Sequence, residues 1–96
     1  MAANAARGEA EVVVGGRARR MRLTLGALAE LERAVGEGGL TGLARRFEAG
    51  EFTAADLIAL LAAGLRGAGE DVTDDEVAAM DFEGGVAGAA RAGARL

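Results

Sequence analysis

Residues Leu57 to Met80 read LIALLAAGLRGAGEDVTDDEVAAM, and the first half of this stretch decides the fold. It belongs to a run from Ala54 to Leu65 in which Asp56 is the only charged residue. A helix that is apolar on every side is typical of a buried helix. We therefore expect a central helix over residues 54–66, on which the other elements of the chain pack.

The same start signal occurs twice around this helix. Residues 52–57 read FTAADL and residues 72–77 read VTDDEV, so each has an apolar residue, a threonine, two further residues, an acid and an apolar residue. In such a capping box the threonine and the acid bind backbone N–H groups at the helix start, and the flanking apolar residues pack on each other. The pattern predicts helices that begin after Thr53 and Thr73. We expect the first to be stopped by the glycines at positions 64, 67 and 69, and the second to end near Met80.

Two more helices are expected before the central one. Thr24 is a suitable N-cap for a helix over residues 25–35, with RLTLGALAELE at residues 22–32 and a stop at the glycine-rich residues 36–39. A shorter helix is expected from about residue 41 to residue 49, closed by Gly50. We expect its two arginines, Arg45 and Arg46, to be solvated.

Residues 9–24 predict a β-hairpin, because EAEVVV and RARRMRLT flank the dipeptide Gly15-Gly16. A two-residue glycine loop suits a type I′ turn and sets the register, with Val14 opposite Arg17. One face then carries two opposite-charge pairs, Glu9 with Arg22 and Glu11 with Arg20, and the other face is apolar. Arg17 and Arg19 share the apolar face near the tip, where they would have to snorkel; a bulge is the alternative.

These elements predict an α+β fold: an N-terminal β-hairpin packed on a small bundle of about four helices, with the buried central helix at 54–66. We expect a disordered lead at residues 1–8 and a single α+β domain at residues 9–83. The Gly/Ala-rich segment 84–96 is expected to be a weak helix or disordered, since it has few apolar anchors.

The composition argues against most chemistry. The 96-residue chain contains no Cys, His, Lys, Tyr, Trp or Pro, so it lacks the usual general base, the thiolate nucleophile and the commonest metal ligands. The acids at 70–76 lack the spacing of a calcium-binding loop, and acids in the first turn of a helix are favoured by the helix dipole. We expect no catalytic residues, no metal site and no cofactor.

The charge is unevenly distributed, and the net charge is −4. Residues 1–23 carry five arginines against two glutamates, whereas residues 53–96 carry three arginines against eight acids. An acidic body disfavours broad binding to nucleic acid. The longest apolar run, residues 57–65, is too short to cross a membrane, and the N-terminus has no apolar signal core. We therefore expect a cytoplasmic protein without membrane contact.

The order of the hairpin, LTLGALAELE, FTAADLIALLAAGLRGAG and DVTDDEVAAM resembles the tail-assembly-chaperone family of gene transfer agents and phages, over roughly residues 8–83. The resemblance implies a small non-enzymatic factor that binds the tape-measure protein, keeps it soluble and helps tail-tube subunits to assemble. Some descriptions of such families name them tail-tube components instead. Family members continue into a fuller apolar C-terminal helix, from which the Gly/Ala-rich segment 84–96 departs.

Three functions follow, in order of expectation. The first is the tail assembly chaperone, which binds the tape-measure protein, the tail-tube subunit or both; the second is a structural tail-tube component. The third is a small nucleic-acid-binding regulator that uses the hairpin arginines, although nucleic acid is disfavoured. Homo-oligomerisation stays open. The candidate partner-binding residues are the arginines near the hairpin tip and apolar residues not needed internally: Arg17, Arg19, Leu40, Leu43, Phe47, Phe82 and Val86.

Overall fold

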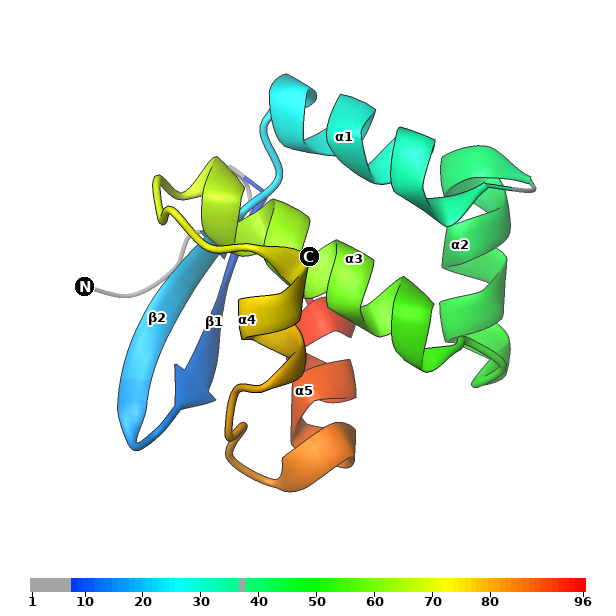
Figure 1. The fold of residues 1–96 in the computed structure, drawn as a ribbon. Coiled ribbons are helices and arrows are strands. Elements are labelled where there is room, and N and C mark those ends of the chain that lie inside the picture. The colour runs from blue at the N-terminus through cyan, green and yellow to red at the C-terminus, as the bar shows by residue number, and fades with distance from the viewer. Residues whose placement is uncertain (1–7, 37) are drawn as a thin grey trace.

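The computed structural model describes residues 8–36 and 38–96, and it confirms the α+β class (Figure 1). The expected disordered lead therefore lies almost wholly outside the described residues, as does Glu37 in the turn expected to end the first helix. These described residues form a hairpin followed by five helices, one more than expected. In chain order the elements are β1 (Glu9–Val14), β2 (Arg17–Arg22), α1 (Leu25–Val35), α2 (Gly39–Ala49), α3 (Ala54–Gly67), α4 (Asp74–Ala78) and α5 (Gly85–Ala94).

The hairpin has the predicted register. Val14 is opposite Arg17 and Glu9 is opposite Arg22, and the pairing is continuous between them, without a bulge. Gly15 and Gly16 both have positive φ, as the tight turn requires. One detail differs: Glu9 is buried, and the ion pair on that face is diagonal, with the Arg20 guanidinium 3.9 Å from the Glu9 carboxylate. The polar face of the hairpin is therefore less exposed at its base than the alternation predicts.

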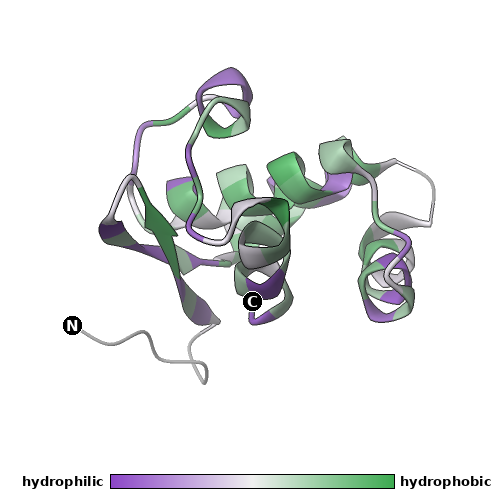
Figure 2. Ribbon diagram, turned by 90° about the horizontal axis from the view of Figure 1, so that it is seen from below, coloured by the Kyte–Doolittle hydropathy of each residue, from purple (hydrophilic) through white to green (hydrophobic). Residues whose placement is uncertain are grey.

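The central helix α3 contacts α1, β2, α4 and α5. Nine of its residues are buried, which agrees with the prediction of a helix apolar on all sides. Leu61 and Leu65 are almost fully enclosed, at 1% and 0% exposure. Figure 2 shows hydrophobic colour concentrated on β1 and α3, while β2 and α2 carry more hydrophilic stretches. The core therefore lies on both sides of α3, with the hairpin on one side and α1 and α2 on the other.

Two of the glycines expected to stop α3 lie where the hairpin approaches the helix most closely. Gly64 lies inside the helix and is buried, and a Cβ there would lie 3.0 Å from the Cβ of Met21. At Gly67, the last residue of the helix, a Cβ would lie 1.9 Å from the Arg22 carbonyl oxygen. The expectation for Gly64 is wrong, because its missing side chain is needed for packing rather than for ending the helix.

Both predicted capping boxes are present. The Thr53 and Thr73 hydroxyls accept from the backbone N–H groups of Asp56 and Glu76, and the two acids accept from the threonine N–H groups in return. Thr24 caps α1 in the same manner by accepting from the Ala27 N–H at 3.1 Å. The starts of these three helices agree with the prediction from the sequence, because each capping partner lies within three residues of the threonine.

Replacing Thr73 by alanine should lower the free energy of unfolding by about 1 kcal/mol, because the Glu76 N–H loses its acceptor. Chemical denaturation of the purified variant would measure the loss. Thr41 is exposed and lies in the first turn of α2, so Thr41→Ala serves as a control that should change stability little. Equal losses in the two variants would argue against the cap.

A short third segment pairs with the outer edge of β1. The Gly15 N–H donates to the Asp81 carbonyl at 2.9 Å, and the Glu83 N–H donates to the Val13 carbonyl at 2.9 Å. Val14 and Phe82 form an isolated antiparallel bridge between these bonds. This pairing leads the chain into α5, which then lies against β1. The segment 84–96, for which helix and disorder were both left open, thus contains a ten-residue helix with Ala89 and Ala92 buried.

Candidate interaction surface

Two apolar hollows lie beside α3, and together they form the candidate functional region. The first hollow, of about 340 Å³, is bounded by α1, α2 and the C-terminal residues, with Leu28, Leu40, Phe47 and Leu96 among its lining residues. The second hollow, of about 430 Å³, lies between α3, α4 and α5, with Ile58, Met80, Phe82 and Val86 among its lining residues. Both linings are mainly apolar, which is typical of surfaces that bind other molecules.

The predicted apolar contact residues divide between the two hollows instead of forming one surface. Leu40, Leu43 and Phe47 line the first hollow, and Phe82 and Val86 line the second. The expectation that Leu43 is not needed internally is wrong, because it is 5% exposed and belongs to the core between α1, α2 and α3. Leu40, Phe47 and Phe82 are half-buried, whereas Val86 is 76% exposed.

Phe47 is also engaged inside the protein. Its ring stacks on that of Phe52, with the centroids 4.4 Å apart and the planes at 5°. The pair joins the end of α2 to the residue before the Thr53 cap. Because stacked rings pack tightly, Phe47 helps to set the corner between α2 and α3 as well as lining the first hollow.

A bidentate ion pair fixes the same corner. The Arg46 Nε and Nη2 atoms donate to the two carboxylate oxygens of Asp56 at 2.8 and 3.0 Å. The hydrogen bond from Arg46 lowers the pKa of the Asp56 carboxyl below its ordinary value. The expectation that Arg46 is merely solvated is therefore wrong. Arg46 and Asp56 are ten residues apart in the sequence and lie in different helices. The periodicity of one helix does not reveal a pair of this kind.

The two predicted arginines at the hairpin tip have different surroundings. The Arg19 guanidinium lies 3.1 Å from the Glu70 carboxylate, so Arg19 joins β2 to the loop after α3. Arg17 is exposed, and no ion pair links it to another described residue. Only Arg17 of these two therefore presents a guanidinium that other molecules can reach without breaking an internal pair.

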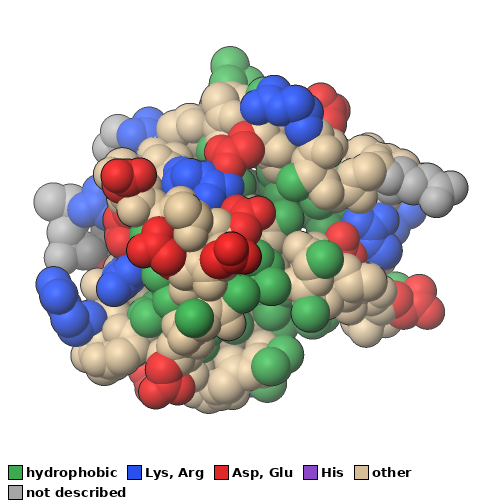
Figure 3. Space-filling view, viewed as in Figure 1, with side chains coloured by type: hydrophobic (Ala, Val, Ile, Leu, Met, Phe, Trp, Pro, Cys, Tyr) green, Lys and Arg blue, Asp and Glu red, His purple; other side chains and the backbone are tan. Residues whose placement is uncertain are grey.

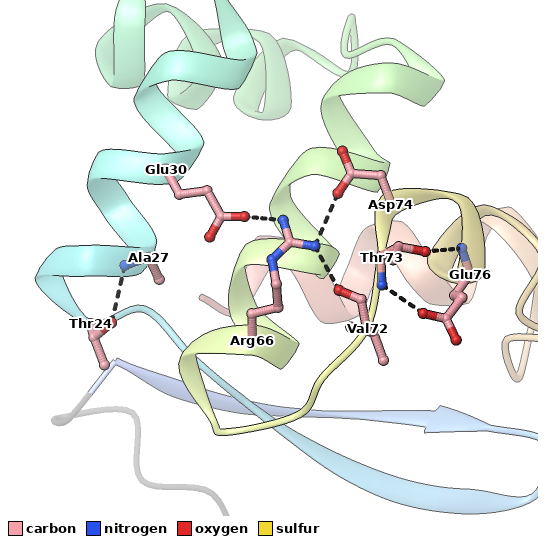
Figure 4. Close-up of polar contacts among 8 residues, drawn as sticks. All are labelled: Thr24, Ala27, Glu30, Arg66, Val72, Thr73, Asp74 and Glu76. Atoms are coloured by element: carbon pink, nitrogen blue, oxygen red, sulfur yellow. Dashed lines mark hydrogen bonds and ion pairs between the residues drawn. The ribbon is translucent and has the colours of Figure 1, made fainter.

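Two acids of α4, Asp74 and Glu76, are used within the fold, as Figure 4 shows. Arg66 donates to Glu30 and to the Val72 carbonyl, and its guanidinium lies 3.1 Å from the Asp74 carboxylate. The hydrogen bond to Glu30 is the main cause of a raised pKa for Arg66. Within residues 8–36 and 38–96, no group of three or more ligand-type side chains is arranged to hold a metal ion.

The space-filling view shows where apolar side chains reach the surface. In Figure 3 they gather in the middle and lower part of the face, over α3, α4 and α5, below a group of acidic side chains. Ile58 and Met80 belong to the lining of the second hollow, although no sequence pattern pointed to them as contact residues. The helix that contains Ile58 was expected to be buried on all sides. Because its sequence has no polar face, it does not indicate which side of the helix other elements cover only in part.

Leu25 is a second exposed apolar residue that the sequence did not single out. It is 85% exposed and is the first residue of α1. None of the helices in the described part of the chain is both long and apolar enough to cross a membrane.

Comparisons with known proteins identify the family. A family model described as phage tail tube protein, GTA-gp10, matches residues 7–96, which is nearly the whole chain. Searches of curated proteins and of solved structures gave no significant match. The match includes the hairpin, the helices and both hollows, as well as α5, which lies beyond the stretch on which the sequence resemblance rests. The chain therefore belongs to the phage tail tube protein family GTA-gp10.

Proposed function

We propose that this protein is a non-enzymatic component of the tail tube of a gene transfer agent or related phage-type particle. The observation that carries this proposal is the family match over residues 7–96. The chain has neither His nor Cys, which agrees with a role in binding rather than catalysis. The family match supports the structural alternative better than the assembly chaperone, which was the first expectation from the sequence.

The apolar hollows support a role in contacts with other tail proteins. A subunit within a tube must bind neighbours on more than one side, and the two hollows open on different groups of elements. Phe82 and Val86 would contact one neighbour, and Leu40 and Phe47 another. Leu43 would act from beneath, by supporting the first hollow.

The assembly chaperone is the second candidate, because an open apolar hollow also suits an apolar helix of a tape-measure protein. The nucleic-acid alternative has less support. Its candidate arginines include Arg19 and Arg20, which have ion-pair partners in Glu70 and Glu9. Strong phosphate binding would have to compete with these pairs.

Purified particles would separate the two tail functions. Quantitative mass spectrometry should find this protein at a copy number similar to that of the major tail protein if it is a tube component. A chaperone should instead be absent from finished particles and should co-purify from cell extracts with the tape-measure protein. Deletion of the gene should give particles without tails in both cases. Normal tails without this protein would contradict both functions.

A further inference from the structure

The second hollow has a lining with one carboxylate. Among the described residues that line it, Asp81 alone is charged, and the others are apolar or glycine. Val86 stands at its edge with 76% of its surface exposed, although it is a large apolar side chain. Ile58 and Met80 are half-buried in the same hollow. An apolar hollow with a single anionic group suits an occupant that brings apolar surface together with one cation.

The hairpin tip lies directly beside this hollow. The Gly15 N–H binds the Asp81 carbonyl at 2.9 Å, and Val14 pairs with Phe82 of the lining. Arg17 is opposite Val14 in the register, is exposed, and has no ion pair with a described residue. One small region of the molecule therefore carries an accessible cation, an accessible carboxylate and an exposed apolar side chain.

We propose that this region is the interface between two copies of the chain related by a two-fold axis, with Arg17 of each copy bound to Asp81 of the other. A two-fold axis brings the same surface of both copies together, so two opposite charges that lie near each other on one copy can pair twice across the interface. The apolar stem of Arg17 and the exposed Val86 would then cover the partner's hollow. Asp81 and Val86 are not used by other side-chain pairs in the described fold, so the contact breaks no existing bond.

The complementarity favours a second copy over a nucleic acid or a membrane. The hollow offers a carboxylate and apolar side chains, which phosphate groups would not bind. The proposal does not depend on the tail-tube function, because it concerns the association of this chain with itself. If the purified chain stays monomeric but is found in tails, the proposal is overturned and the tail-tube function is left intact.

Sedimentation equilibrium of the purified chain over a range of concentrations tests the interface. We expect a monomer–dimer equilibrium for the unchanged protein. Val86→Asp should raise the dissociation constant about tenfold or more, because it puts a charge into the apolar contact. Leu25→Asp is the matched control: it changes the other highly exposed apolar residue, outside the hollow, and should leave the constant unchanged.

A charge exchange tests the pairing of Arg17 with Asp81. Arg17→Glu and Asp81→Arg should each weaken the dimer, since like charges then face each other across the axis. A mixture of the two variants should form a heterodimer. In one half of its interface the introduced glutamate faces the introduced arginine, and in the other half the unchanged Arg17 faces the unchanged Asp81. Differently tagged variants would show this by co-purification, and circular dichroism would check that each is folded.

Three results would overturn the proposal. The first is a monomer at every concentration; the second is a dimer that Val86→Asp leaves unchanged. The third is a pair of charge variants that fail to associate with each other although both are folded. If Val86→Asp does not fold, the charge exchange decides alone, because both of its positions are exposed.

Discussion

Gly67→Ala is expected to destabilise the protein by about 3 kcal/mol, the largest effect we predict for a single methyl group. The new Cβ would lie 1.9 Å from the Arg22 carbonyl oxygen and 3.2 Å from the Ala27 Cβ. The oxygen belongs to the backbone of β2, so no side-chain rotation relieves the contact and the hairpin must move away from α3. Urea denaturation of the variant would measure the loss.

The sign of this effect distinguishes packing from helix propensity. Alanine is favoured over glycine within helices by up to about 1 kcal/mol, so propensity alone would make the variant more stable. Gly26 is the matched control: it lies in α1, is exposed, and a Cβ there would meet nothing closer than the Thr24 hydroxyl at 3.8 Å. Gly26→Ala should therefore stabilise the protein slightly. If Gly67→Ala also stabilised the protein, the close approach of the hairpin to α3 would not contribute to the free energy of unfolding.

Asp56→Ala is expected to lower the free energy of unfolding by about 2–3 kcal/mol. Its carboxylate binds the Arg46 guanidinium through two hydrogen bonds and accepts from the Thr53 N–H at 3.0 Å. Removal of the carboxylate leaves Arg46 half-buried without this anion and opens the capping box of α3. Glu51 is an exposed acid in the same α2–α3 connection, so Glu51→Ala is the control and should change stability by less than about 0.5 kcal/mol.

The contribution of Asp56 should depend on pH in a defined direction. The hydrogen bond from Arg46 holds the pKa of Asp56 below its ordinary value in the folded state. A depressed pKa stabilises the fold above the ordinary aspartate pKa, and this stabilisation disappears as the pH falls through the lower folded value. The difference in unfolding free energy between the unchanged protein and Asp56→Asn should therefore be full at pH 7 and shrink below about pH 4. A difference that stays constant down to about pH 3 would mean that the ion pair contributes nothing.

The candidate interaction surface was predictable in part. Val86 was expected to be free for contacts, and it is exposed, because a short apolar side chain in a Gly/Ala-rich helix has few neighbours that could cover it. Leu43 and Phe47 were expected on the same surface, but Leu43 is buried, and Phe47 both lines the first hollow and stacks on Phe52. Both residues lie in the amphipathic helix α2. The sequence pattern of a helix indicates which of its faces is apolar, but it does not indicate how much of that face a neighbouring helix covers.

The sequence by itself determined the features that depend on residues close together in the chain. The starts of α1, α3 and α4 follow from threonine caps whose partners lie three residues away. The hairpin register follows from a two-residue glycine turn combined with alternating apolar residues. Burial of α3 follows from composition, since a helix without a polar face has no side to turn towards water.

Only the tertiary structure decided the features that depend on distant residues. It assigned Gly64 and Gly67 to the approach of β2, paired Arg46 with Asp56, and divided the apolar contact residues between two hollows. It also showed that residues 81–83 bind β1 and so bring α5 against the hairpin. The physical reason is the range of the interactions: caps and turns are closed by neighbours along the chain, whereas packing contacts and ion pairs between elements exist only after the chain has brought those elements together.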